Sequence, residues 1–110
     1  MSDEQLLLEV IEVHETGRVR VRLRGELDAA SAPAVAARLR ALRGPGQRVL
    51  LDLDDLAFID MSGLRVVLAA ADDASRDGWA FTVTRGSPAV RRLIELVGVD
   101  GRLPFDGSSR

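Results

Sequence analysis

Short apolar runs alternate with helix-like patterns along most of the chain, and this alternation limits the fold more than any other feature. Four apolar runs have the length and composition of strands, and three segments carry apolar residues three or four apart, as amphipathic helices do. Their order is strand, strand, helix, strand, helix, strand, helix, with a possible short strand at the end. Because strands separated by helices usually join a sheet in parallel, we predict an α/β fold with a mixed sheet of four to five strands, three to four helices and a parallel centre.

The first two strands are expected to form a β-hairpin. Residues 6–13 are apolar and β-branched, and the turn signal of residues 15–17 separates them from a run in which Val19, Val21 and Leu23 alternate with arginines. Residues 25–28 are expected to leave this second strand. A central strand is predicted at 49–53, where apolar residues are consecutive, followed by a loop that holds Asp54 and Asp55. Further strands are expected at residues 80–84 and, at a sheet edge, at 103–105.

The three helices have recognisable starts and stops. Ser31 is the expected N-cap of the first, with Pro33 in its first turn, and residues 44–46 end it. The second is expected to open at Ser62 and to end at Gly78. The third should run from residue 87 to residue 98. Its inward face is expected to hold four residues: Val90, Leu93, Ile94 and Val97.

The bulk composition excludes several classes of protein. We expect one domain over residues 1–110, with 106–110 as a frayed tail, and we expect it to be cytoplasmic, because no apolar run approaches the ~20 residues of a membrane span. The chain has no cysteine, which excludes thiolate metal sites, and no lysine, which excludes a Schiff base and a phosphate-loop lysine. The net charge of −2 gives no general attraction to nucleic acid. No cofactor and no metal are expected.

Two groups of side chains suggest metal or acid–base chemistry. His14 is the only histidine, and a solvated turn residue is favoured over a catalytic base. Carboxylates near the carboxyl end of a parallel strand could hold a cation such as magnesium, although a solvated loop is the preferred interpretation. Four aspartates lie there: Asp52, Asp54, Asp55 and Asp60.

Four arginines alternate along the second strand and suggest a contact with a nucleic-acid backbone: Arg18, Arg20, Arg22 and Arg24. An acidic net charge and few aromatic residues for stacking bases argue against that function. Charged side chains on the solvated face of a hairpin also suppress edge-to-edge pairing, and this structural role is favoured.

Ser62 lies between a buried strand and a helix, within the run from Ile59 to Leu64. A hydroxyl at a helix N-terminus often serves only as an N-cap. The same position accommodates negative charge, since free N–H groups and the helix dipole favour an anion there. A phosphate on Ser62 would add about −1.5 to −2 charges to the surface, which suits a switch better than a catalyst. The flanking residues lack the first glycine of a nucleophile elbow, so a small hydrolase that uses Ser62 is the least favoured possibility.

Two segments carry a recognisable pattern: residues 23–31 (LRGELDAAS), and residues 49–53 (VLLDL) followed by 58–64 (FIDMSGL). They resemble the STAS domain family, and in particular its anti-sigma factor antagonists of the stage II sporulation AA kind. The first is similar to the family's strand-to-helix segment, and the second resembles the segment that is phosphorylated. The spacing of the segments and the order of elements also match, so the resemblance covers nearly the whole chain.

The resemblance implies that Ser62 is a phosphate acceptor and that the residues around it bind a partner. In the family, a serine or threonine in an aspartate-x-serine-glycine setting is phosphorylated by a partner that is both anti-sigma factor and serine kinase. The partner-binding set implied here is Asp28, Ser31, Asp60, Met61, Ser62, Gly63 and Leu64. Met61 departs from the family, which often has serine or threonine there, and its flexible apolar side chain could alter partner choice or the efficiency of phosphorylation.

The resemblance therefore implies a regulator of sigma-factor-dependent transcription rather than an enzyme. It would bind the anti-sigma kinase when Ser62 is unphosphorylated and release it when Ser62 is phosphorylated, and a separate phosphatase would reset it. No direct contact with nucleic acid and no membrane insertion are expected, and a homodimer is possible. The alternative is a STAS accessory subunit that docks on a membrane transporter of the lipid-transport ATPase type without switching.

Overall fold

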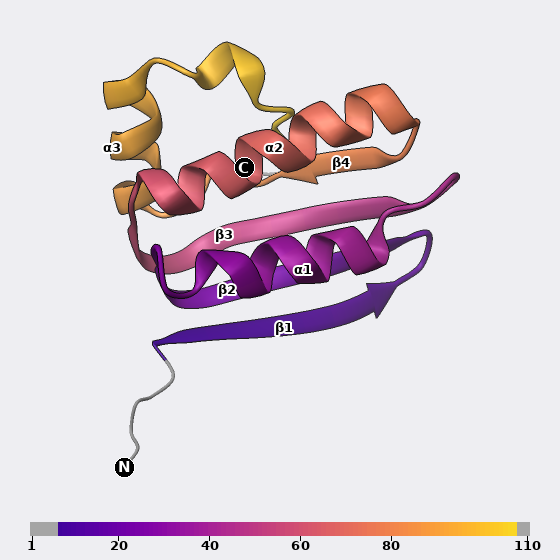
Figure 1. The fold of residues 1–110 in the computed structure, drawn as a ribbon, viewed down its shortest axis with the longest axis horizontal. Helices are drawn as coiled ribbons and strands as arrows, with labels where there is room; N and C mark the ends of the chain where they lie inside the picture. The colour runs from indigo at the N-terminus through magenta and orange to yellow at the C-terminus, as the bar shows by residue number, and fades with distance from the viewer. Residues whose placement is uncertain (1–6, 108–110) are drawn as a thin grey trace.

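The computed structural model describes residues 7–107, which form one mixed sheet with helices packed on it (Figure 1). The strands lie in the order β1-β2-β3-β4. They are β1 (Leu8–Glu15), β2 (Arg18–Leu27), β3 (Arg48–Ile59) and β4 (Ala80–Val83). The helices are α1 (Ala32–Leu42), α2 (Met61–Asp77) and α3 (Pro88–Val97), followed by a 3₁₀ turn, η1 (Asp100–Arg102).

The predicted hairpin and parallel centre are both confirmed. β1 pairs with β2 in antiparallel register, from Leu8 opposite Gly25 to Glu15 opposite Arg18. β2 and β4 each pair with β3 in parallel, so β3 is central. The sequence pattern predicted this because parallel strands need crossover helices, and α1 and α2 are those crossovers.

One face of the sheet is covered by α1 and α2, which lie side by side in Figure 1. The apolar residues of β2 and β3 that point to this face are almost fully buried, as are Val35 of α1 and Val67 of α2. α3 begins beside the middle of β3, where the Ser87 N–H donates to the carbonyl oxygen of Leu53. No helix within residues 7–107 combines the length and the apolar character needed to cross a bilayer.

The strands extend further than the sequence predicted. β1 begins at Leu8 and continues to Glu15, whereas Leu6 lies outside the described residues. The expectation that residues 25–28 leave β2 was wrong, because Gly25 pairs with both Leu8 and Leu56. Gly25 has a φ of +112°, and a β-carbon there would collide with the Leu7 carbonyl oxygen, so a side chain at this position is excluded.

The expected loop at Asp54 and Asp55 was also wrong. β3 continues to Ile59, and two register shifts against β2 absorb its extra residues, one between Arg22 and Arg24 and one between Gly25 and Glu26. Such bulges insert unpaired residues into a strand, which disguises the alternation that sequence reasoning relies on.

The C-terminal part of the chain differs from the expectation in three details. Val97 is 39% exposed, so it does not face inward with Val90 and Ile94. Residues 103–105 form one isolated bridge, Val83 to Phe105, instead of a strand. In the tail, Asp106 is held by a hydrogen bond from its N–H to the Val83 carbonyl oxygen, and residues 108–110 lie outside the described residues.

An ion pair joins α1 to α2 at their C-terminal ends. Arg43 Nη1 lies 2.8 Å from Asp73 Oδ1, and the indole Nε1–H of Trp79 donates to Asp73 Oδ2 at 3.0 Å. Trp79 is buried, and its ring meets Phe81 edge-on with 5.6 Å between centroids. The carboxylate of Asp73 therefore connects the C-terminal ends of both helices to the buried Trp79, which directly precedes β4.

We predict that Asp73→Asn removes part of the acid sensitivity of folding. The hydrogen bond from Trp79, followed by that from Arg43, holds the pKa of Asp73 below its usual value. A carboxylate with a lowered folded-state pKa stabilises the protein above its unfolded-state pKa, and this contribution disappears as the pH falls through the folded-state pKa. The variant should be less stable than wild type at neutral pH, and the two should converge in acid. Urea unfolding followed by the fluorescence of Trp79, the only tryptophan, measures this directly.

Asp72→Asn is the matched control for that measurement. Asp72 lies next to Asp73 but is 57% exposed, and its only described contact is Arg102 at 3.4 Å. Its removal should leave the pH profile of stability unchanged, because an exposed pair contributes little. Equal profiles for wild type and Asp73→Asn would contradict the role given to the Asp73 carboxylate.

Candidate functional site

Asp60, and not Ser62, caps α2. The Asp60 side chain accepts a hydrogen bond from the Gly63 N–H at 3.1 Å, and its carbonyl oxygen accepts from the Leu64 N–H at 3.0 Å. The interpretation of Ser62 as an N-cap was therefore wrong. Ser62 is the second residue of α2 and is half-buried, and within the described part of the chain its hydroxyl has no hydrogen-bond partner. Because Asp60 already performs the capping, the Ser62 hydroxyl is available for chemistry at the helix N-terminus.

The end of β2 lies directly beside the start of α2. Leu27 pairs with Ile59, and the Asp60 N–H donates to the Leu27 carbonyl oxygen at 3.2 Å. Residues that follow two paired strand ends meet at the same edge of the sheet, so Asp28 and Asp60 leave the sheet together. The structure thus brings the 28–31 turn and the α2 N-terminus to one edge, although they are far apart in sequence.

Asp28 and Ser31 form a closed turn of hydrogen bonds before α1. Asp28 Oδ1 accepts from the backbone N–H groups of Ala30 and Ser31, both at 3.1 Å. The Ser31 hydroxyl donates to the Glu26 carbonyl oxygen at 2.9 Å and accepts from the Asp28 N–H at 3.0 Å. Ser31 occupies the N-cap position that the sequence predicted, but its side chain makes no cap hydrogen bond. Its hydroxyl fixes the shape of the turn instead.

Gly63 and Leu64 lie on the buried side of the first turn of α2, where Gly63 contacts Leu27 of β2. A β-carbon on Gly63 would lie 2.6 Å from Leu27 Cγ and 2.8 Å from the Leu27 carbonyl oxygen, so only glycine allows this approach. Leu64 is 1% exposed. Met61 is partly buried and packs against the core. These residues position the first turn of α2, on which Ser62 lies.

Phe58 is an exposed aromatic residue that the sequence reasoning did not select as a site residue. It is 46% exposed and precedes Asp60 by two positions, while its neighbour Ile59 is buried. Buried anchors at protein interfaces are often aromatic. If residues 56–59 had been assigned to a strand, alternation from buried Ile59 would have predicted an exposed Phe58. The expected loop at Asp54 and Asp55 prevented that assignment.

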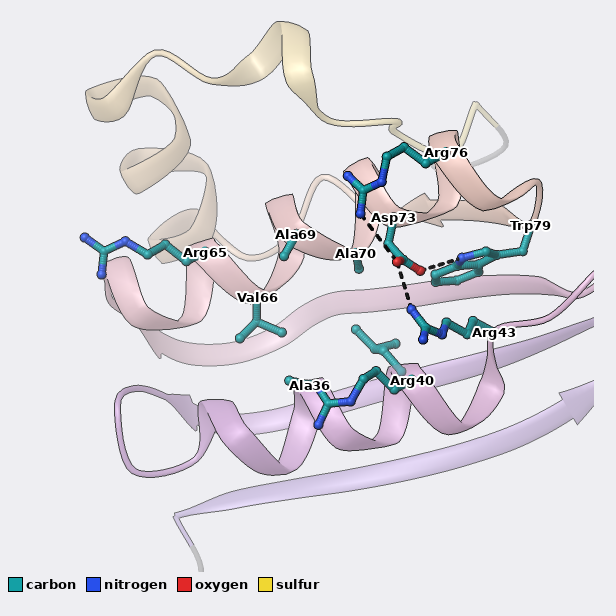
Figure 2. A pocket seen from close by; sticks show the side chains of 11 residues that line it. Ala36, Arg40, Arg43, Arg65, Val66, Ala69, Ala70, Asp73, Arg76 and Trp79 are labelled. Atoms are coloured by element: carbon teal, nitrogen blue, oxygen red, sulfur yellow. Dashed lines mark hydrogen bonds and ion pairs between the residues drawn. The ribbon is translucent and has the colours of Figure 1, made fainter.

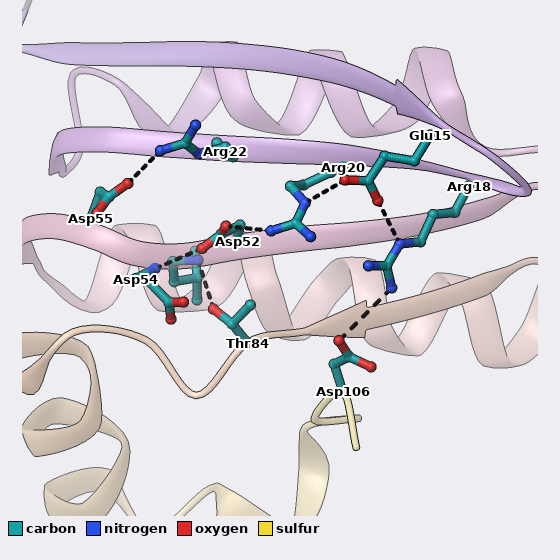
Figure 3. A network of polar contacts seen from close by, with 10 residues as sticks. Glu15, Arg18, Arg20, Arg22, Asp52, Asp54, Asp55, Thr84 and Asp106 are labelled. Atoms are coloured by element: carbon teal, nitrogen blue, oxygen red, sulfur yellow. Dashed lines mark hydrogen bonds and ion pairs between the residues drawn. The ribbon is translucent and has the colours of Figure 1, made fainter. Parts of the chain in front are cut away.

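The sheet face opposite α1 and α2 carries a network of paired charges (Figure 3). Arg20 lies between Glu15 and Asp52, with N–O distances of 2.9 and 3.2 Å, and Arg22 lies 2.9 Å from Asp55. Hydrogen bonds from Arg18, and then from Arg20, hold the pKa of Glu15 below its usual value. Arg18, Arg20 and Arg22 are thus paired within the sheet, and exposed Arg24 lies 3.9 Å from Glu9, so the four arginines do not form a free basic stripe.

The remaining candidates from the sequence are placed as follows. Asp52 is 6% exposed, and its second oxygen accepts a hydrogen bond from the Asp54 N–H. Within residues 7–107, no group of three or more His, Cys, Asp or Glu side chains is arranged to hold a metal ion. His14 lies at the end of β1 with its side chain 69% exposed, 3.4 Å from Glu12.

Comparisons with known proteins agree with this architecture. The family described as "Mlab, STAS domain" matches residues 11–104. The chain belongs to the STAS domain family. Among curated STAS relatives, the anti-sigma F factor antagonist of Paenibacillus polymyxa is 31% identical over 94 residues, covering 84% of this chain and 80% of the relative. The anti-sigma-B factor antagonist of Bacillus subtilis is 26% identical, covering 83% and 84%. These relatives are regulators that act by binding, not enzymes.

Solved STAS structures show the same fold. An anti-sigma factor antagonist from Mycobacterium paratuberculosis superposes with a TM-score of 0.73 at 25% identity, covering 91% of this chain and 86% of that one. The anti-sigma factor antagonist SpoIIAA in its unphosphorylated form gives a TM-score of 0.70 at 22% identity, covering 89% and 88%. The predicted membership of the STAS family and the predicted STAS-like fold are both confirmed.

Proposed function

We propose that this STAS protein is an anti-sigma factor antagonist whose binding to an anti-sigma factor is controlled by phosphorylation of Ser62. The observation that carries the proposal is the position of the half-buried Ser62, whose hydroxyl lies in the first turn of α2 and does not cap the helix, because Asp60 does. The names of the curated relatives supply the class of partner. In this proposal the partner is both anti-sigma factor and serine kinase, and binding of this protein to the partner displaces a sigma factor from it.

Charge is the proposed means of release. A phosphate on Ser62 would place about −1.5 to −2 charges within the contact surface. Burying such a charge without a partner cation is strongly unfavourable, so the complex would dissociate. A 100-fold loss of affinity requires only ~2.8 kcal/mol, since each tenfold corresponds to ~1.4 kcal/mol.

The fold need not change when the phosphate is added. The α2 N-terminus presents free N–H groups and a dipole that favour an anion, so the modified serine is accommodated where it stands. Of the partner-binding set, Asp28, Ser31 and Asp60 are proposed to shape the docking edge, with Met61 and Ser62 at its centre. Gly63 and Leu64 are buried and are proposed to act through the position of α2. Phe58 is proposed as an additional contact.

A pull-down from a lysate of the source organism tests the proposal. Tagged wild-type protein and Ser62→Ala are used as parallel baits, and the captured proteins and the phosphorylated residues of the bait are identified by mass spectrometry. Capture of a protein with a kinase domain by both baits, with phosphate found on Ser62 of the wild type alone, is the expected result. Equal capture of a membrane transporter by both baits, with no phosphate on Ser62, would instead make this chain an accessory subunit.

A further inference from the structure

A groove of about 360 Å³ runs between α1 and α2 on the outer side of the helical layer (Figure 2). Its floor is apolar and built mainly from small side chains. Five residues form it: Ala36, Leu39, Val66, Ala69 and Ala70. Buried Trp79 closes one end, where it is fixed by its hydrogen bond to Asp73. The groove does not include Ser62 or any other residue of the docking edge described above.

The rim of the groove is strongly basic in a chain whose net charge is −2. Four arginines and one aspartate line it, which gives the rim a charge of +3: Arg40, Arg43, Arg65, Arg76 and Asp73. Arg43 is satisfied by Asp73, and Arg76 approaches the same carboxylate at 3.7 Å. Arg40 and Arg65 have no ion pair within the described residues, and both are exposed. The Arg76 side chain also remains 69% exposed, so three cations face solvent beside an apolar floor.

The spread of these cations indicates the shape of the ligand. Arg65 and Arg76 are 11 positions apart on α2, which is ~16 Å along a helix axis, and Arg40 lies across the groove on α1 (Figure 2). A small anion with one charged head would pair with one of these arginines and leave the others unmatched. A partner helix of about three turns could place carboxylates opposite all of them. Alanine in the floor allows such a helix to approach closely.

We propose that the α1–α2 groove binds an acidic amphipathic helix of a protein partner. The apolar face of that helix would contact the alanine-rich floor, and its aspartate or glutamate side chains would pair with Arg40, Arg65 and Arg76. Recognition of this kind, in which an amphipathic helix lies in a groove, uses apolar anchors three and four residues apart. The groove would give this protein a second interaction surface, separate from the docking edge around Ser62.

A peptide titration tests the groove directly. The probe is a synthetic 16-residue helical peptide with leucine and alanine on one face and glutamate on the flanks (a length of about four turns). The matched peptide has the same composition with its residues permuted, so that the two faces are lost. Binding to the full chain is followed by the fluorescence of Trp79, which lines the groove, and by anisotropy of a label on the peptide. The amphipathic peptide should bind, and its affinity should fall as salt is added. The permuted peptide should not bind.

Charge reversal at Arg40 then locates the binding. Arg40→Glu should weaken binding of the amphipathic peptide by about tenfold, because one attraction becomes a repulsion. Arg92→Glu is the control, since it makes the same charge change on an exposed part of α3 outside the groove, and it should bind as wild type does. Circular dichroism confirms that both variants fold.

Other results would overturn the proposed occupant. Equal binding of the permuted peptide, or equal effects of the two arginine variants, would show attraction by net charge alone. Preferential binding of phosphatidylglycerol vesicles would indicate a membrane surface, and self-association that depends on Arg40 would indicate a second copy of the chain. Ser62→Ala prevents phosphorylation without adding charge beside Arg65 and should leave peptide binding unchanged, so failure at this groove and failure of the Ser62 switch are distinguishable.

Discussion

Ser62→Asp is expected to weaken binding of the anti-sigma partner by about 100-fold, a loss of ~2.8 kcal/mol. The new carboxylate would lie in the first turn of α2, where the helix dipole stabilises it in the free protein. Partner binding would remove the water around this charge, and that desolvation penalty lowers the affinity. Ser62→Ala removes the hydroxyl without adding charge and should retain binding while preventing phosphorylation. Isothermal titration calorimetry with the partner recovered by pull-down measures all three forms under one set of conditions.

Ser75→Asp is the matched control for this prediction. It adds the same charge to an exposed position of the same helix, 13 residues further on, which is ~20 Å along the axis. Binding by this variant should equal that of wild type if the position of the charge, and not the net charge, is decisive. Undiminished affinity of Ser62→Asp for a partner that demonstrably phosphorylates Ser62 would exclude release by charge.

Local sequence patterns correctly predicted helices with an apolar stripe over several turns and strands in which apolar and polar residues alternate. The apolar stripe of α2 and the alternation of Val19, Val21 and Leu23 both appear as expected, because burial on one face selects those residues. The errors lie where long-range pairing overrides local signals. Asp54 and Asp55 favour a loop by composition, but the pairing of β3 with β2 through two bulges keeps them in the strand.

The candidate site depended on a different kind of information. Ser62 drew attention by its position between a strand and a helix, but its interpretation as a phosphate acceptor came from the family resemblance. The sequence could not tell which of Asp60 and Ser62 caps α2, because both residue types are good N-caps and three-dimensional geometry decides. The adjacency of Asp28 and Asp60 rests on the register of Leu27 with Ile59, which no local pattern contains. The α1–α2 groove likewise exists only once two helices pack together.

Gly63→Ala is expected to lower the free energy of unfolding by ~2 kcal/mol and Tm by roughly 10 °C. The new β-carbon would lie 2.6 Å from Leu27 Cγ and 2.8 Å from the Leu27 carbonyl oxygen, and Leu27 is fully buried, so neither atom can move freely. Alanine normally stabilises a helix by ~1 kcal/mol relative to glycine, and this gain opposes the collision without cancelling it. Thermal unfolding followed by circular dichroism measures the net effect.

The same substitution should also reduce partner binding, because α2 can escape the collision only by moving its first turn away from β2. That movement breaks the alignment of Ser62 and Asp60 with the 28–31 turn, so affinity should fall even at temperatures where the variant is folded. Gly101→Ala is the control, since its β-carbon would meet nothing within 4 Å, and it should change stability by less than about 0.5 kcal/mol. If Gly63→Ala were as stable as wild type and bound the partner equally well, the close contact between α2 and Leu27 could not be what positions Ser62.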